Sequence, residues 1–147
     1  MNKSGFATPQ DAENAFYEAL ENGDVDAMMD VWADDEEIVC VHPGGPRLTG
    51  YEAVLQSWSR IFRSGQRLKV DRSEPVVLAG MMLTVHSLHE NITTSGDQSA
   101  PARVAATNAY LRTASGWRMI VHHASPEPQA ARAPSPVPDL IPPKILH

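Results

Sequence analysis

The chain has 147 residues, of which 42% are apolar and 20% charged, and its formal net charge is −6. This length predicts one domain that buries a core without disulfides, and no apolar run approaches the ~18 residues that a membrane-spanning helix needs. The charge pattern argues against nucleic-acid binding, because eleven acids and no Lys or Arg occupy residues 4–46 and no basic run follows.

Two helices are predicted at the start of the chain. Thr8 can cap the first helix and Pro9 suits its first turn. Gly23 ends this helix, and Asp24 caps a second, shorter one. Apolar residues recur at a spacing of three to four, which is typical of one buried helical face. They are Ala12, Ala15, Phe16, Ala19, Leu20, Val25, Met28, Met29 and Trp32.

The pattern changes from helices to strands along the chain. A short strand is predicted at residues 38–42, which the Pro-Gly-Gly-Pro stretch at residues 43–46 ends. Thr49 and Glu52 fit a capping box, in which Glu52 bonds back to the first amide of a third helix. Four strands are then predicted at residues 67–78, 81–93, 102–112 and 117–125, separated by turn residues. Helices followed by consecutive antiparallel strands indicate an α+β fold.

We divide the chain into an N-terminal lead (residues 1–7), a pocket domain (8–126) and a Pro-rich tail (127–147). Seven of the 22 residues from Pro126 onward are Pro, which excludes a helix or sheet interior there. The apolar end of this tail either docks on the domain or a neighbouring subunit, or is disordered. The start lacks the apolar segment of a signal peptide, and Cys40 has no second cysteine to pair with. We therefore expect a cytoplasmic protein.

The order of these elements resembles the nuclear transport factor 2-like superfamily, and its SnoaL-like branch in particular. The resemblance covers about residues 8–126. It implies a cone-shaped, curved antiparallel sheet wrapped by three N-terminal helices, also called cystatin-like, with a deep pocket at the open end and a homodimer formed through the sheet. The motifs that carry it are Asn22-Gly23-Asp24, Trp32-Ala33-Asp34-Asp35, Val41-His42-Pro43-Gly44-Gly45, Leu48-Thr49-Gly50, Gly116-Trp117-Arg118 and Val121-His122-His123-Ala124-Ser125.

Two catalytic candidates follow from the resemblance. His42 stands where similar isomerases have an Asp base, and imidazole can accept and return a proton near neutrality. Asn108 stands where those enzymes place a donor to the developing oxyanion. The alternatives are a half-buried His42 bonded to backbone, and an Asn108 that faces solvent or a subunit interface. Phe16 replaces the Tyr that is their second donor, and Tyr17 lies about 100° round the helix, so steroid isomerase chemistry in its known form is not expected.

Five further residues are predicted to line the ligand pocket. The third helix covers the pocket mouth in similar folds, which favours Trp58. His122 lies on the same side of its strand as Ala124, which matches a ligand-binding Arg of the kinase association domains. The alternative for the aromatic residues is ordinary core packing. The predicted lining residues are Trp58, His122, Phe16, Trp32 and Tyr51.

Neither a metal nor a cofactor is expected. His86 and His89 are an odd number of residues apart and so face opposite sides of a strand, as do His122 and His123. The chain also lacks a phosphate-binding loop and a nucleophile motif.

These observations leave two hypotheses for function, because the superfamily holds isomerases, cyclases and dehydratases as well as non-catalytic transport and association domains. The first is a homodimeric protein that binds a small apolar organic ligand and acts as a cofactor-free acid–base enzyme. The second is a non-catalytic association module. Its sheet dimerises, and its acidic helices or Pro-rich tail recognise a partner. For either function, the acidic helix face is solvated or meets a basic group on a partner subunit, formed by Arg60, Arg63, Arg67, Lys69 and Arg72.

Overall fold

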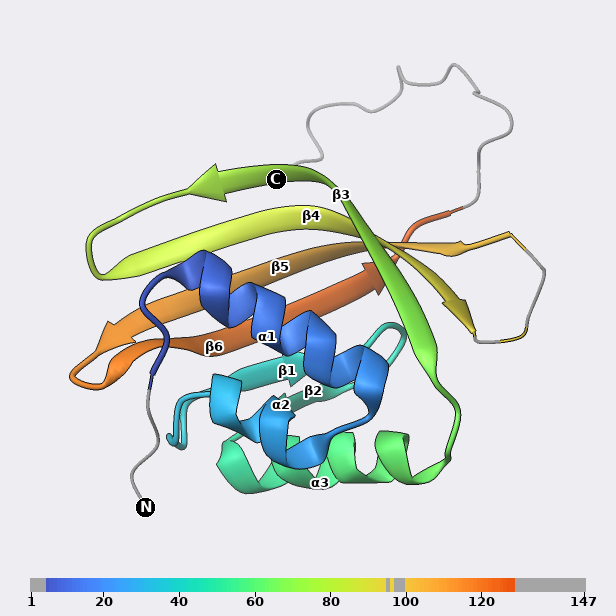
Figure 1. Cartoon of the computed structure of the whole chain (residues 1–147), viewed down its shortest axis with the longest axis horizontal. Coiled ribbons are helices and arrows are strands. Elements are labelled where there is room, and N and C mark those ends of the chain that lie inside the picture. The colour runs from blue at the N-terminus through green and yellow to red at the C-terminus, as the bar shows by residue number, and fades with distance from the viewer. Residues whose placement is uncertain (1–4, 95, 97–99, 129–147) are drawn as a thin grey trace, which may run out of the picture.

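The computed structural model describes residues 5–94, 96 and 100–128. Three helices, α1 (Pro9–Asn22), α2 (Val25–Val31) and α3 (Tyr51–Arg63), lie against one side of a six-stranded curved sheet (Figure 1). The α+β class is therefore confirmed. The strands are β1 (Val39–Val41), β2 (Arg47–Thr49), β3 (Leu68–Leu78), β4 (Leu83–Thr94), β5 (Ala102–Thr113) and β6 (Gly116–Pro126), and their order in the sheet is β2-β1-β6-β5-β4-β3.

The sheet is mixed, which corrects the prediction of an antiparallel sheet. β1 runs parallel to β6, with Cys40 opposite His122, while every other pairing is antiparallel. A parallel pair needs a long connection, and here α3 and three long strands lie between β1 and β6 in the chain. The sequence pattern of each strand is the same in either arrangement, so it does not reveal the direction of pairing.

The predicted ends of α1 and the start of α2 are confirmed. Thr8 Oγ1 accepts a hydrogen bond from the Asp11 N–H at 3.0 Å, and Asp24 Oδ1 accepts one from the Ala27 N–H at 3.0 Å. Gly23 ends α1 with a φ of 65°. The capping box of α3 was wrong, because Thr49 is paired with Val39 in β2 and Gly50 is the N-cap without a side-chain bond.

The core lies between the helices and the inner face of the sheet. Along β4 the buried side chains alternate with exposed or half-buried ones, so Thr84, His86, Leu88 and Glu90 face inward. α1 packs across this face and contacts β3, β5 and β6. Polar groups of α1 and of the central strands therefore meet inside the molecule.

The residues on either side of the predicted domain also contact the sheet. Phe6 forms a bridge with Trp117 at the start of β6, and the Glu127 N–H donates to the Arg103 carbonyl at 2.9 Å. The predicted tail from residue 129 onward lies outside the described residues, as does the turn at 95–97 apart from Gly96. Among the described helices, none is long and apolar enough to cross a membrane.

Candidate functional site

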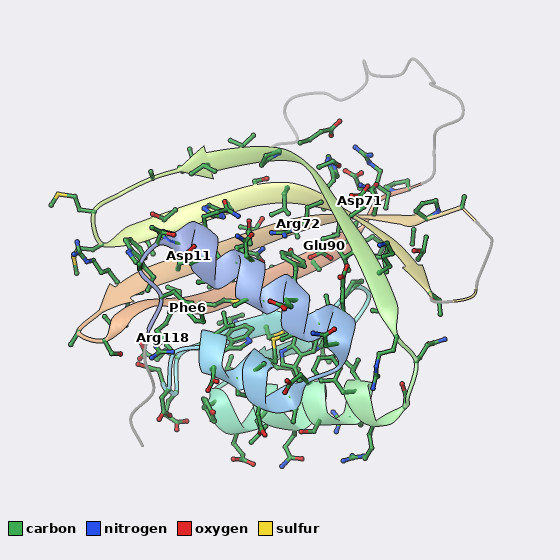
Figure 2. All side chains as sticks on the ribbon, viewed as in Figure 1. Phe6, Asp11, Asp71, Arg72, Glu90 and Arg118 are labelled. Atoms are coloured by element: carbon green, nitrogen blue, oxygen red, sulfur yellow. The ribbon has the colours of Figure 1, made fainter. Side chains whose placement is uncertain are left out.

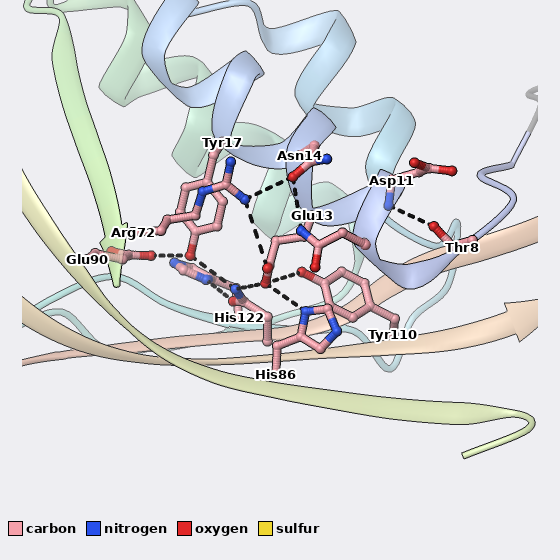
Figure 3. A network of polar contacts seen from close by, with 12 residues as sticks. Thr8, Asp11, Glu13, Asn14, Tyr17, Arg72, His86, Glu90, Tyr110 and His122 are labelled. Atoms are coloured by element: carbon pink, nitrogen blue, oxygen red, sulfur yellow. Dashed lines mark hydrogen bonds and ion pairs between the residues drawn. The ribbon is translucent and has the colours of Figure 1, made fainter. Parts of the chain in front are cut away.

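A buried cluster of polar side chains lies between α1 and the sheet (Figure 3). Its centre is Glu13, which is only 4% exposed. Glu13 Oε2 accepts hydrogen bonds from the Asn108 amide at 3.1 Å and the Tyr110 hydroxyl at 3.0 Å. His86 Nδ1 lies 3.0 Å from the same oxygen without forming a hydrogen bond. Two donors and a nearby imidazole on one carboxylate oxygen offset the cost of burying it.

Asn108 connects this carboxylate to His122. Its Nδ2 donates to Glu13 and to the Tyr17 hydroxyl, the latter at 3.0 Å, while its Oδ1 lies 2.6 Å from His122 Nδ1. The reverse orientation would direct Oδ1 at the Glu13 carboxylate, so the contacts fix the amide. His122 therefore donates from Nδ1 and carries its lone pair on Nε2. Burial lowers the pKa of His122 to about 3, with His42 and His123 as lesser causes, so the ring is neutral at neutral pH.

Tyr17 and Glu90 form the other end of the cluster. The Tyr17 hydroxyl donates to Glu90 Oε2 at 2.5 Å. Burial raises the pKa of Glu90 to about 7, the Tyr17 hydrogen bond opposes this shift, and the charge of Glu13 adds to it. A carboxyl group that titrates near neutrality can both give and take a proton.

Arg72 covers the cluster on its solvent side, beside Glu90 on the neighbouring strand (Figure 2). Its guanidinium carbon is 4.8 Å from the centre of the Tyr17 ring, and its Nη1 donates to Asn14 Oδ1 at 3.1 Å. The same nitrogen is 3.9 Å from Glu13 Oε1, beyond hydrogen-bond distance. Arg72 and Glu13 Oε1 are therefore the groups by which the buried cluster meets solvent.

A pocket of about 400 Å³ opens at this point between α1 and β3. We call it the α1–β3 pocket. Glu13 and Arg72 line this pocket and also contact the buried cluster, so they connect the two. The full lining is Gln10, Glu13, Asn14, Val70, Asp71, Arg72, Ser73, Pro75 and Leu88.

Four of the predicted site residues form an aromatic group that joins the polar cluster through His122; they are Phe16, His42, Trp58 and His122. The Trp58 ring is 4.6 Å from His42, 5.7 Å from Phe16 and 6.4 Å from His122, between ring centres. Phe16 and Trp58 are buried at 0% and 2% exposure. They pack between α1, α3 and the sheet. The contacts that connect His42 to Asn108 pass through the rings of Trp58 and His122.

His42 itself is half-buried at the end of β1. Its Nε2 lies 3.0 Å from Ser57 Oγ, and the Ser57 hydroxyl donates to the Val54 carbonyl at 2.9 Å. Because that hydroxyl has a single hydrogen, His42 donates from Nε2 and keeps its lone pair on Nδ1. Burial lowers the pKa of His42 to about 4, and the charge of Arg60 adds to the effect. The ring is a neutral base at neutral pH.

The two remaining predicted residues lie elsewhere. Trp32 is fully buried and forms a bridge with Met119. Tyr51 begins α3, and its pKa is raised by burial and then by Asp34 and Asp30. It therefore lies near acidic residues at and just after the end of α2. Neither Trp32 nor Tyr51 lines the α1–β3 pocket.

Several cluster residues were not singled out from the sequence. Glu13 precedes Phe16 by three positions on the buried stripe of α1, and Glu90 continues the even-numbered inner face of β4. The sequence signal that could have identified them is a charged residue at a position that the helix or strand pattern predicts to be buried. Among the described residues, no group of three or more His, Cys, Asp or Glu is arranged to hold a metal ion.

Comparison with known proteins identifies similar chains. The sequence model of a family described as a SnoaL-like domain matches residues 10–128. A structure from Thiobacillus denitrificans, provisionally named a calcium/calmodulin-dependent protein kinase type II association domain, is 39% identical, with a TM-score of 0.74, over 84% of this chain and 98% of that one. A structure from Streptomyces avermitilis, provisionally named a dehydratase of the NTF2-like family, is 33% identical, with a TM-score of 0.74, over 81% and 93%.

One curated protein is also similar. The F-box protein SKIP8 of Arabidopsis thaliana is 24% identical over 112 residues, which are 75% of this chain. The chain spans 46% of the length of that protein.

Proposed function

This chain belongs to the SnoaL-like domain family, and we propose that it binds a small organic molecule in the α1–β3 pocket and catalyses proton transfer there without a cofactor. The observation that carries the proposal is the buried cluster of Glu13, Tyr17, Glu90 and Asn108 that meets solvent at this pocket. Burying two carboxyl groups in one cluster costs stability, and such arrangements are typical of functional sites. The dehydratase name of the Streptomyces avermitilis structure supports acid–base chemistry.

We assign the proton acceptor to Glu13. Its Oε2 is held by Asn108 and Tyr110, which leaves Oε1 toward Arg72 and the pocket. In the proposed step, Oε1 takes a proton from carbon beside a substrate carbonyl. The C–H electron pair forms a C=C bond to the carbonyl carbon, and the C=O π pair moves to the oxygen. Arg72 stabilises the resulting negative oxygen. The proton returns at another carbon, or a leaving group departs.

Asn108 then has a positioning role. Both of its N–H groups already donate, to Glu13 and to Tyr17. These bonds favour a role for Asn108 in orienting the Glu13 carboxylate, rather than in donating directly to the substrate oxyanion.

The experiment measures exchange of carbon-bound protons in D₂O by ¹H NMR, using carbonyl compounds that raise the melting temperature of the full chain. Glu13→Gln is expected to lower the exchange rate at least ~100-fold, because the amide is not a base. Glu74→Gln is the matched control, since Glu74 lies on the other face with a side chain 63% exposed. Unchanged exchange in a folded Glu13→Gln variant would remove Glu13 from the mechanism.

His42 remains a proposed alternative base, because its ring is neutral and its Nδ1 carries the lone pair. The same exchange assay on His42→Ala decides between the two. Loss of exchange in His42→Ala together with normal exchange in Glu13→Gln would place the chemistry in the aromatic group around Trp58 instead.

The second candidate function is a non-catalytic association module, cytoplasmic and dimeric through the sheet. The Thiobacillus denitrificans structure supports it by name, and so does an apolar outer face. On this face Leu83 lies opposite Leu111, and the two are 47% and 37% exposed. Sedimentation equilibrium of the wild type and Leu111→Asp tests it. A dimer that dissociates in the variant, combined with no exchange activity in the wild type, would favour the module.

A further inference from the structure

A second pocket lies at the N-terminal end of α1. It has a volume of about 290 Å³ and a mainly apolar surface, to which His86 contributes the one titratable side chain of its lining. We call it the α1–hairpin pocket, because its other side is formed by the turn between β3 and β4. Its lining is Thr8, Pro9, Gln10, Val77, Ala79, Gly80, Thr84, His86 and Trp117.

The two pockets follow one another along the same groove. On α1, Gln10 lines both pockets, and Glu13 is less than one helical turn further along. On β4, His86 lines the α1–hairpin pocket and Leu88 lines the α1–β3 pocket. These are successive inward positions, about 7 Å apart. The sequence order along both elements therefore brings the two pockets end to end.

The contact between the pockets is itself part of the buried cluster. Glu13 lines one pocket and His86 the other, and His86 Nδ1 is 3.0 Å from Glu13 Oε2 (Figure 3). A molecule lying in the groove would pass this pair. One end would meet polar side chains and the other end apolar ones.

The polar end favours a hydroxyl group. Glu13 Oε1 and Arg72 Nη1 are 3.9 Å apart, too far to bond directly. An oxygen placed between them can lie about 2.8 Å from each, donating to the carboxylate and accepting from the guanidinium. A carboxylate in this place could not donate a hydrogen bond to Glu13, and an ammonium group could not accept one from Arg72, whereas a hydroxyl does both.

We propose that the two pockets form one elongated site for a neutral amphipathic molecule, an alcohol or phenol whose hydroxyl lies between Glu13 and Arg72 and whose apolar body lies against Val77 and Trp117. The inference rests on the proposed function, which assigns ligand binding to the α1–β3 pocket. It adds the second half of the site and a class of ligand that competes with the carbonyl substrate, because its hydroxyl takes the place that the enol oxygen has during the reaction.

The test is a titration of the ¹⁵N-labelled full chain with 1-hexanol, followed by ¹H–¹⁵N NMR. The six-carbon chain is long enough to extend from one pocket to the other. We expect the Trp117 indole and the Ser73 amide to shift with the same dissociation constant. Hexanoate and 1-hexylamine share the six-carbon chain and differ in the head group. Their dissociation constants are expected to be at least about tenfold higher than that of 1-hexanol.

Two variants test which pocket holds the head group of the ligand and which holds its apolar chain. Arg72→Met removes the head-group contact and is expected to weaken 1-hexanol about tenfold. Arg103→Met is its control, since Arg103 is also partly exposed but bonds Glu74 and Glu127 on the outer face. Ala79→Trp fills the α1–hairpin pocket and is expected to abolish the Trp117 shift.

The outcomes separate this inference from the function it rests on. Shifts confined to the Ser73 side would overturn the elongated site and leave ligand binding at Glu13 standing. Tighter binding of hexanoate or 1-hexylamine would overturn the head-group class. Absence of shifts with all three probes, in a protein that also fails the exchange assay, would overturn both proposals.

Discussion

Glu90 lies on the inner face of β4 with its carboxyl against the Tyr17 hydroxyl, and it is 2% exposed. Burial raises its pKa to about 7, while the Tyr17 hydrogen bond lowers it. We predict that ¹³C NMR of labelled Glu side chains finds one carboxyl titrating near pH 7. Tyr17→Phe removes the opposing bond and is expected to move that midpoint upward. A Glu90 midpoint at or below pH 5 would contradict the buried cluster.

The individual residues of the site were the part of the structure that the sequence predicted least well. The resemblance directed attention to His42 and Asn108, but the polarity at Glu13 and Glu90 was hidden within patterns assigned to the core. Hydrophobic periodicity identifies a buried face from its apolar members and says nothing about which polar side chains converge across it. That convergence depends on how α1 crosses the sheet, and the distances follow only from the packed structure.

At the scale of elements, Gly116 fixes how the start of β6 meets the N-terminal segment. Its φ is 113°, and a Cβ there would lie 2.8 Å from the Gly5 backbone. Gly116→Ala therefore combines an unfavourable φ with a backbone clash, and we predict a loss of at least ~2 kcal/mol in the free energy of unfolding.

The matched control is Gly65→Ala. Gly65 has a φ of 83° with no atom within 4 Å of the added Cβ, so it has the conformational cost alone, about 1 kcal/mol. Urea unfolding of both variants separates the two effects. Equal losses would show that the contact between residues 5 and 116 adds nothing to stability.

Elements were predicted well where the local signal is strong. The four long strands lie within a few residues of their predicted bounds, because alternation and turn residues mark both ends of each. β2 was missed because its three residues, following Pro46, are too short to show alternation. That omission also caused the error at α3, since Thr49 belongs to the ladder with Val39 and is not available as a cap.

For the whole molecule, three buried groups determine how stability depends on pH. His42 and His122 have a folded pKa of about 4 and about 3, below the ordinary histidine value, whereas Glu90 has a folded pKa of about 7, above the ordinary glutamate value. The histidines contribute stability that is present above about pH 6.5 and is lost as the pH falls through their folded pKa values. Glu90 acts in the opposite direction. Its contribution is present below about pH 4.5 and is lost as the pH rises through 7.

Between about pH 6.5 and 4.5 the two histidines therefore oppose one carboxyl group. One uncompensated group changes the free energy of unfolding by about 1.4 kcal/mol per pH unit at most. We predict that acidification in this window destabilises the protein with roughly that slope, measured from urea unfolding at closely spaced pH values. In Glu90→Gln the opposing contribution is absent, so the slope should approach twice the wild-type value. A wild-type stability that is flat over this window would mean that one of the two histidines binds a proton in the folded state, and a stability that rises on acidification would mean that both do. The second result would contradict the neutral His122 that follows from its burial.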